Sequence, residues 1–323
     1  MLLVTSTPAE EQVRRLRGAL EARGADVVLF DPSRFPEEVR LSVAFEGGER
    51  RTALELPERV VELARVSAVW WQRPLPPQAS ALVPPEQREW AARQAAALLD
   101  GIWDGLDVLW VPGPRRVAEA SDAKVRQLEV AQRLGLRVPR TLVTNDPARA
   151  LAFYDACEGC LVSKALRSGG AVRDGEKHLA YTHVVRRRDL QHLAGVERAP
   201  VIFQELVPKR LELRVTVVGQ RAFTAAIDSQ SSPFAREDLR RADDLVACAT
   251  HELAPEVEAL CVRLVQALGL AFGAIDMVLT PAGEHVFLEV NASGQWAWVE
   301  TRAGLPITAA LADLLVGASA QRV

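Results

Sequence analysis

Hydrophobic and polar positions follow two alternating patterns in the first third of the chain. Short apolar runs of strand length are separated by stretches in which apolar residues recur every three or four positions. This alternation predicts a mostly parallel sheet flanked by helices. The expected strands lie at residues 2–5, 26–30, 68–71 and 108–111, and the expected helices at residues 9–22 and 86–103.

The pattern changes after Pro112-Gly-Pro114, which indicates a domain boundary. A helix should follow, with Ser121 as its N-cap and Lys124 in its first turns. Strands become dense after residue 200, with helices expected at residues 255–268 and 305–315. We therefore expect an α/β fold that becomes α+β in its C-terminal half. The predicted domains are residues 1–114, 115–200 and 201–323.

The most informative segment is a predicted hairpin near the C-terminus. Residues 274–280 and 286–291 alternate like strands, and Pro281-Ala-Gly-Glu284 has the length of a hairpin loop. A symmetric hairpin pairs Thr280 with His285, Val278 with Phe287 and Asp276 with Glu289. The apolar face would then consist of Ile275, Met277, Leu279, Val286, Leu288 and Val290.

The opposite face of this hairpin would carry Asp276, Glu289 and Asn291 together. Two carboxylates directly opposed across strands repel and weaken a sheet. A magnesium ion reverses that effect, because Mg²⁺ prefers oxygen ligands and is held by carboxylates together with substrate phosphates. The alternative is an ordinary solvated face, because antiparallel sheets often expose one side to water.

Further candidates for phosphate and nucleotide binding precede the hairpin. Lys164 ends an apolar strand and is followed by the loop Ser168-Gly-Gly170, which suits phosphate oxygens. Residues 203–208 form an apolar segment that Pro208 ends, and its backbone could meet an adenine edge. Glu212 and Arg214 share one face of an alternating strand. Each feature alone also fits a solvated loop or sheet face, so their order along the chain carries the argument.

Composition excludes several classes of function. The 323 residues carry a net charge of −3, with 25% charged residues, and nothing favours nucleic acid or a membrane surface. No apolar run approaches the roughly 20 residues that span a bilayer, and the start lacks a basic signal region, so a cytoplasmic location is expected. The first strand–helix turn, Thr5-Ser-Thr-Pro-Ala9, has none of the glycines that a dinucleotide fingerprint requires.

Four short stretches resemble one enzyme family. They are Trp70-Trp-Gln-Arg-Pro74, Leu213-Arg-Val-Thr-Val-Val-Gly219, Ala225-Ala-Ile-Asp-Ser-Gln230 and Leu288-Glu-Val-Asn-Ala-Ser-Gly-Gln-Trp296. The chain resembles the ATP-grasp carboxylate–amine ligases over nearly its full length. Within them it is similar to the peptide maturases that make microviridin-type products (graspetides). This resemblance implies an ATP-grasp fold with an N-terminal Rossmann-like pre-ATP-grasp domain, a small central domain and a C-terminal antiparallel-sheet domain.

The resemblance also implies a nucleotide site. Lys124 and Lys164 would hold the ATP phosphates, and Glu212 would hold the ribose. The adenine would be lined, largely through the backbone, by Gln204, Glu205 and Leu206. Two positions depart from the family pattern. Glu212 stands where many relatives have aspartate, and Ala292 stands where proline is common.

The same resemblance assigns the metal and the catalytic groups. Asp276, Glu289 and Asn291 would carry Mg²⁺, and Arg214 and Arg240 would face the γ-phosphate and the activated carboxylate. The implied reaction uses ATP to join Asp or Glu side chains of a ribosomal precursor peptide, which has a leader and a core, to its Ser, Thr or Lys side chains. A homodimer is also implied. The alternatives are an amino-acid ligase acting on a small molecule or protein tail, and a non-catalytic nucleotide- or peptide-binding module.

Overall fold

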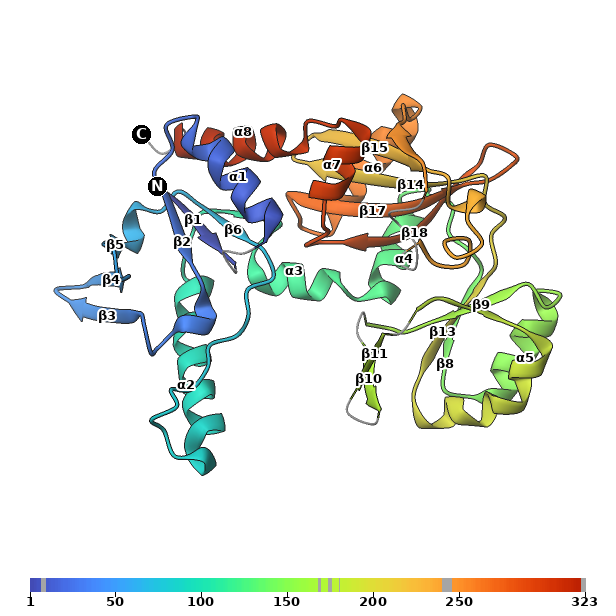
Figure 1. Ribbon diagram of the computed structural model, residues 1–323, viewed down its shortest axis with the longest axis horizontal. Helices are drawn as coiled ribbons and strands as arrows, with labels where there is room; N and C mark the ends of the chain where they lie inside the picture. Colours follow the sequence, from blue (N-terminus) through green and yellow to red (C-terminus); the bar gives the residue numbers. More distant parts are fainter. Residues whose placement is uncertain (7–9, 168–169, 174–175, 180, 240–245, 321–323) are drawn as a thin grey trace.

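The computed structural model of the chain describes residues 1–6, 10–167, 170–173, 176–179, 181–239 and 246–320. The strands of these residues form five sheets, arranged in three parts (Figure 1). The predicted α/β character with an antiparallel C-terminal half is confirmed. Within the described residues, no helix is both long and apolar enough to cross a bilayer.

The N-terminal sheet is parallel and has the strand order β2-β1-β6-β7. Its strands are β1 (Leu2–Thr5), β2 (Val27–Phe30), β6 (Ala68–Trp71) and β7 (Leu109–Val111). Leu2 and Val4 pack on one face, against α1 (Glu11–Glu21) and the C-terminal helix α8 (Ile307–Ala320). Leu3 packs on the other face, against α2 (Pro85–Asp104). Helix α8, near the C-terminus, therefore completes the hydrophobic core on one face of the N-terminal sheet.

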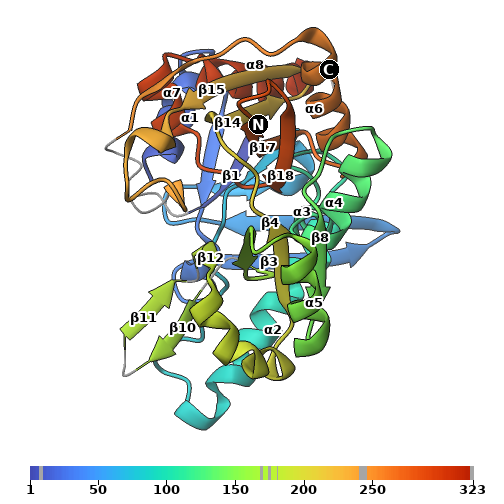
Figure 2. The same ribbon diagram turned by 90° about the vertical axis from the view of Figure 1, so that its right-hand side faces the viewer.

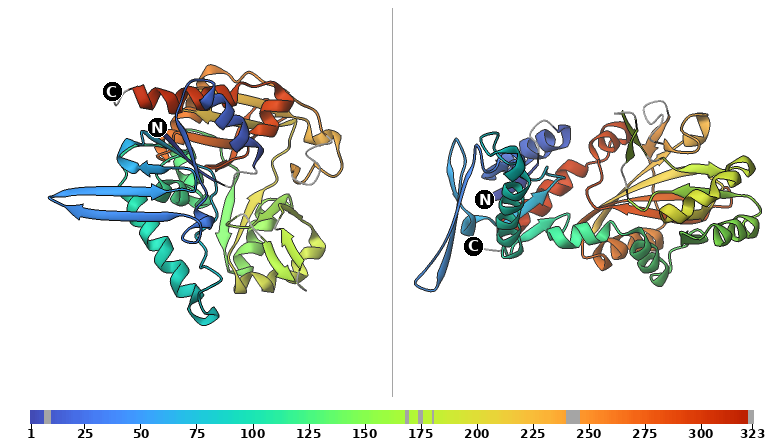
Figure 3. Two further views of the ribbon diagram at one scale, coloured as in Figure 1. Left: turned by 60° about the vertical axis from the view of Figure 1, so that its left-hand side comes forward. Right: turned by 90° about the horizontal axis from the view of Figure 1, so that it is seen from below.

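A three-stranded antiparallel sheet that the sequence analysis missed extends from this part. It consists of β3 (Arg40–Glu46), β4 (Glu49–Glu55) and β5 (Val60–Glu62). Figure 3 shows the β3–β4 hairpin projecting away from the body of the molecule. Because most of its side chains touch water, β4 contains charged residues instead of a clear apolar alternation.

The central sheet is antiparallel, with the order β12-β9-β13-β8. Its strands are β8 (Thr141–Thr144), β9 (Leu161–Lys164), β12 (His183–Val185) and β13 (Val201–Glu205). Helix α5 (Pro147–Ala156) and the 3-10 segment η3 (Arg187–Arg198) cover one face, and the sheet lies beside the hairpin of β10 (Gly170–Arg173) and β11 (Glu176–Leu179) (Figures 1 and 2). Strand β13 belongs to this sheet although it follows residue 200. The domain boundaries at residues 114 and 200 stay predictions.

The C-terminal sheet is antiparallel, with the order β16-β15-β14-β17-β18. Its strands are β14 (Leu211–Val218), β15 (Arg221–Ile227), β16 (Cys248–Thr250), β17 (Phe272–Leu279) and β18 (His285–Asn291). Leu213, Val215 and Val217 face a core that α4 (Lys124–Arg133) and α6 (Pro255–Ala267) complete. Alternate residues on β14 face the other way, as the sequence predicted.

The expected N-cap of α4 is wrong. Ser121 is the last residue of the preceding helix, α3 (Arg115–Ser121). Its hydroxyl donates a hydrogen bond to the carbonyl oxygen of Ala118, at 2.6 Å. Ser121 does not cap α4, because α4 begins at Lys124 and its N-cap position is occupied by Ala123, which has no side-chain cap.

The predicted register of the β17–β18 hairpin is correct at Asp276 and wrong between Asp276 and the hairpin loop. Leu279 pairs with His285, so the loop is one residue longer than expected. A β-bulge at Leu288 then shifts the register back by one residue, and Asp276 faces Glu289 as predicted. Consequently Phe287 enters the core, while Val286 and Leu288 lie with Val278 on the opposite face.

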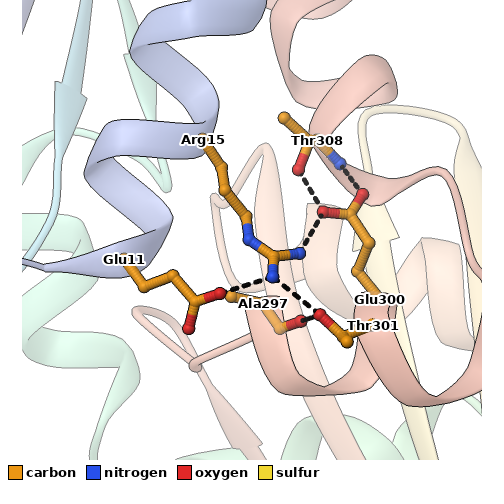
Figure 4. A network of polar contacts seen from close by, with 6 residues as sticks. All are labelled: Glu11, Arg15, Ala297, Glu300, Thr301 and Thr308. Carbon is orange, nitrogen blue, oxygen red and sulfur yellow. Dashed lines mark hydrogen bonds and ion pairs between the residues drawn. The ribbon is translucent and has the colours of Figure 1, made fainter.

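A polar network joins the C-terminal helices to α1 (Figure 4). Glu300, in α7 (Ala297–Ala303), accepts a hydrogen bond from the backbone N–H of Thr308 at 2.7 Å, and another from its hydroxyl. Arg15 of α1 contacts Glu300 at 3.4 Å and Thr301 at 2.7 Å. The Glu300 carboxylate thereby caps the N-terminus of α8 and pairs with the N-terminal domain.

We predict that Glu300→Ala lowers the free energy of unfolding by about 1–3 kcal/mol, because it leaves the first turn of α8 without its acceptor. Denaturant unfolding measures this loss. The matched control is Glu21→Ala, which removes a carboxylate from the half-exposed Arg17–Glu21 pair and should cost less than about 0.5 kcal/mol. Equal losses in the two variants would contradict the capping role of Glu300.

Candidate active site

A cavity of about 420 Å³ lies between the central and C-terminal sheets. Strands β9 and β13 line one side, and β14, β17 and β18 line the other. A volume of this size is typical of a small-molecule site. The fold therefore places the polar face of the C-terminal sheet against the strand ends of the central sheet.

The opposed carboxylates lie at the wall of this cavity. Asp276 is the direct cross-strand partner of Glu289, and Asn291 donates a hydrogen bond to Asp276 Oδ2 at 2.9 Å. Arg214 Nη1 lies 2.6 Å from Asp276 Oδ1, and Lys124 Nζ lies 2.9 Å from Glu289 Oε2. Each carboxylate thus has its own cation, which offsets the repulsion between strands.

Charge and burial shift the acidity of this group of side chains. Burial raises the pKa of Asp276, and Glu289 adds to this effect while Arg214 opposes it. Burial also acts to raise the pKa of Glu289, but the Lys124 ammonium, helped by Lys164 and Arg214, outweighs it and lowers that pKa. The two carboxylates therefore differ in proton affinity although they face each other.

Lys164 differs from Arg214 and Lys209, which also line the cavity. Burial lowers the pKa of its ammonium. Among the residues that the structure describes, Lys164 forms no ion pair, whereas Arg214 and Lys209 are each paired with a carboxylate. An ammonium in this setting is available to an anionic ligand such as a phosphate.

Glu212 is held by two neighbours on the cavity wall. Lys209 Nζ lies 2.8 Å from Glu212 Oε1, and the hydroxyl of Ser229 donates to the same oxygen at 2.8 Å. These contacts fix the carboxylate at the cavity surface. Ser229 belongs to the Ile-Asp-Ser-Gln stretch, so that sequence signature has a direct structural role.

The bulge at Leu288 also shapes the cavity. It allows two consecutive residues, Leu288 and Glu289, to line the same space. Val207, Val278 and Val286 form an apolar cluster with Leu288, and three of these four side chains line the cavity. An apolar wall therefore stands directly beside the carboxylates, an arrangement that fits a flat ring attached to a charged group.

Gly294 follows β18 and closes the cavity beside Arg214. A Cβ atom at Gly294 would lie 2.4 Å from Cβ of Ala274, so only glycine fits this approach between strand and loop. The next residue, Gln295, accepts a hydrogen bond from Arg214 Nη2 at 3.5 Å. The Gly-Gln-Trp signature thus brings a backbone carbonyl to the guanidinium of Arg214.

The chain is similar to one known family model and to several solved structures. A family model described as the MvdD pre-ATP grasp domain matches residues 1–117. The macrocyclase MdnC from Microcystis aeruginosa, bound with precursor peptide MdnA, is 31% identical with a TM-score of 0.87, over 98% of this chain and 99% of that chain. This chain is a member of the ATP-grasp macrocyclase family. No curated protein sequence matches it.

Two further solved structures are similar to this ATP-grasp chain. A RiPP-associated ATP-grasp ligase from Chryseobacterium gregarium, in complex with ADP and a leader and core peptide, is 28% identical with a TM-score of 0.91 over 98% of this chain and 96% of that chain. The ATP-grasp ligase PsnB, complexed with a minimal precursor, Mg and ADP, is 25% identical with a TM-score of 0.76 over 98% and 97%. The N-terminal, central and C-terminal parts are all covered.

The ATP-grasp chain brings most of the predicted site residues to one cavity. Those that line it are Lys164, Gln204, Glu205, Leu206, Glu212, Arg214, Asp276, Glu289 and Asn291. Lys124 contacts Glu289 from α4 without lining the cavity. Arg240 lies outside the described residues, although its neighbours Asp238 and Leu239 line the cavity. The roles of all these residues stay predictions.

Gln127 is a positioning residue that the sequence analysis missed. Its buried side chain donates to the carbonyl oxygen of Val290 at 2.7 Å and accepts from the N–H of Val290 at 2.9 Å. It also donates to the carbonyl oxygen of Ser121 at 2.7 Å. Gln127 therefore holds β18 at the residue between Glu289 and Asn291. The available signal was its place three residues after Lys124, on the same side of α4.

We predict that Gln127→Ala lowers the free energy of unfolding by about 2–4 kcal/mol, because each buried backbone group left without a partner costs about 1–3 kcal/mol. Hydrogen exchange should also be faster at the backbone amide of Val290. Gln132→Ala is the matched control, because Gln132 is exposed on the same helix. If both variants were equally stable, Gln127 would not be the clamp on β18.

Proposed function

We propose that this protein is an ATP-dependent peptide macrocyclase. It would join Asp or Glu side chains of a ribosomal precursor peptide to Ser or Thr hydroxyls or Lys amines, with release of ADP and phosphate. The observation that carries this proposal is the Asp276–Glu289 pair with Asn291, in a cavity that also holds Lys164 and Arg214. Its family supplies the second support, because similar chains were solved with ADP and precursor peptides.

The donor set fits Mg-ATP. Asp276, Glu289 and Asn291 offer the oxygen ligands that Mg²⁺ prefers, and when bound the ion would neutralise charge on the β- and γ-phosphates. Lys164 and Lys124 would hold phosphate oxygens. These two ammonium groups come from different parts of the chain, β9 and α4, so they would approach the phosphates from different sides.

The remaining wall suits the nucleoside. Backbone groups of Glu205 and Leu206, with the side chain of Gln204, would meet the adenine edge. Leu288 and Val278 would pack on the ring. Glu212, held by Lys209 and Ser229, would accept hydrogen bonds from the ribose hydroxyls.

The proposed reaction has two steps. An oxygen of the peptide carboxylate attacks the γ-phosphorus, the bond from this phosphorus to the β–γ bridging oxygen breaks, and ADP leaves with the electron pair. A hydroxyl or amine then attacks the carbonyl carbon of the acyl phosphate, the carbon–oxygen bond to phosphate breaks, and the proton of the nucleophile is taken up by the phosphate that leaves. One water is lost per cross-link. Arg214 and Arg240 would stabilise the negative charge that develops, and positioning would supply much of the remaining rate.

A mass-spectrometric assay tests the proposal. The substrate is a synthetic precursor peptide with a leader and a core rich in Ser or Thr and in Asp or Glu, and a short reading frame beside the gene that encodes such a peptide would supply its sequence. With Mg-ATP we expect loss of one water per cross-link, and fragmentation distinguishes ester from amide bonds. If ADP were released with a free amino acid and the peptide stayed unchanged, the amino-acid ligase would be the better reading.

We predict that Glu289→Gln lowers the cross-linking rate at least about 100-fold, comparable to removal of one preorganised electrostatic contact in other enzymes. The cause would be loss of a charged metal ligand. The matched control is Glu284→Gln, which makes the same chemical change in the loop of the same hairpin, on a half-exposed residue outside the cavity. An unchanged rate in Glu289→Gln would refute the metal assignment. The homodimer stays a prediction.

A further inference from the structure

The N-terminal sheet has a switch point beside the cavity. Strand β1 lies between β2 and β6, and α1 and α2 cover opposite faces of the sheet. In open α/β sheets, ligands bind outside the carboxyl ends of the strands where the direction of winding reverses. In this chain the described residues at that place are Thr5 and Ser6 at the end of β1, and Gln72 and Arg73 after β6.

The backbone at this edge is fixed in a strained conformation. Arg73 has a φ of +42°, in the left-handed region that non-glycine residues rarely adopt. Pro74 follows, and a residue before proline prefers an extended backbone. The N–H of Gln72 donates to the carbonyl oxygen of Thr5 at 3.0 Å, and Ser6 Oγ donates to the carbonyl oxygen of Gln72 at 2.8 Å. Strain that neighbouring contacts hold in place is characteristic of functional sites.

This conformation directs Arg73 to the cavity that holds Asp276, Glu289 and Lys164. Its side chain has no hydrogen-bond or ion-pair partner among the residues that the structure describes. Burial raises the pKa of the nearby Asp122 carboxyl, and the charge of Arg73 opposes this shift. Arg214, by contrast, is paired with Asp276. Arg73 therefore brings a guanidinium with available donors from the N-terminal domain into the site of the other two parts.

We propose that Arg73 binds the peptide carboxylate that is to be activated and holds it against the γ-phosphate. This inference rests on the proposed function. A guanidinium matches a carboxylate with two parallel hydrogen bonds, which a lysine ammonium does not provide. The candidate phosphate ligands, Lys164 and Lys124, come from β9 and α4, whereas Arg73 comes from β6, so the two anions would be held from separate elements.

Arg73 would act in both steps without transferring a proton. In the first, one carboxylate oxygen stays bonded to the guanidinium while the other attacks the γ-phosphorus, and the electron pair of the broken bond leaves with ADP. In the second, negative charge develops on the oxygen that Arg73 still holds when the nucleophile adds. A fixed donor at that oxygen lowers the barrier, because it stabilises the charge only as it forms.

Stability and catalysis should separate in the variants of Arg73. Arg73→Gly relaxes the positive φ, so its unfolding temperature should equal or exceed that of the wild type. We nevertheless expect kcat/KM for the precursor peptide to fall about 100-fold or more in Arg73→Gly and Arg73→Gln. The Kd for a non-hydrolysable Mg-ATP analogue should stay the same. Arg65→Gln, an exposed arginine of the same domain, is the matched control.

A second peptide identifies the group that Arg73 binds. It is the same synthetic precursor with its reacting Asp or Glu residues replaced by Asn or Gln. In the presence of the Mg-ATP analogue, the wild type should bind this amide peptide several-fold more weakly than the acidic one, since hydrogen bonds to charged groups contribute more than neutral ones. Arg73→Gln should bind the two peptides equally.

The outcomes are distinguishable. If the wild type cross-links no peptide, the proposed function fails, whatever Arg73 does. If the wild type cross-links the precursor and both Arg73 variants do so with unchanged kcat/KM, the assignment of Arg73 is wrong. If the variants weaken binding of the Mg-ATP analogue but still discriminate between the acidic and the amide peptide, then Arg73 binds phosphate and the assignment is equally overturned.

Discussion

The opposition of Asp276 and Glu289 across two strands is the constraint on which the rest of the structure depends. Two carboxylates at adjacent positions of a sheet are unfavourable unless charges of the other sign stand beside them. The chain provides Arg214 from β14 and Lys124 from α4, at 2.6 Å and 2.9 Å. In the proposed function, a bound magnesium ion would supply this neutralisation. Arg214 and Lys124 would then be available to the phosphates, so the same charges would serve with and without nucleotide.

Helix α4 connects this charge pair to the remainder of the molecule. It carries both Lys124 and Gln127, which hold β18 through the Glu289 carboxylate and through the backbone of Val290. After β18 in the sequence, helices α7 and α8 pack on α1 and the N-terminal sheet. The C-terminal sheet is thus supported by α4 on one side and, through α7 and α8, by the N-terminal part. The N-terminal part also contributes Arg73 to the cavity, so that residues from all three parts of the chain line or contact the site.

Local patterns in the sequence were sufficient for the sheet faces and for most of the cavity. The alternation of Leu213, Arg214 and Val215 predicted which side chain would face the ligand, because side-chain direction depends only on strand periodicity. The pairing of Asp276 with Glu289 was also correct, but two errors cancelled: the loop is longer by one residue, and the bulge at Leu288 restores the register. A bulge depends on which side chains the core accepts, and this information is tertiary.

Other features left little or no local signal. Gln127 holds a strand that is 163 residues away in the sequence. Its place three residues after Lys124 indicates the side of α4 on which it lies but not the strand that it contacts. The position of Arg73 at the cavity can be recognised only once β6 is placed beside β1 and the left-handed backbone of Arg73 is known. The β3–β4 hairpin is charged and mostly exposed, so the apolar alternation that reveals other strands is weak there. Apart from this hairpin, what could not be predicted is contact between segments that are distant in the sequence.

Register is the property that these distant contacts protect. Strand β18 lies at the edge of its sheet, where a slip by one residue would turn Glu289 and Asn291 from the cavity into the core. Gln127 occupies both backbone groups of Val290, and the N–H of Phe287 donates to the carbonyl oxygen of Arg137 at 2.8 Å. With its outer edge bonded on both sides of the bulge, the strand has a single register. An edge strand can therefore carry the proposed metal ligands, because the segment around α4 replaces the neighbouring strand that it lacks.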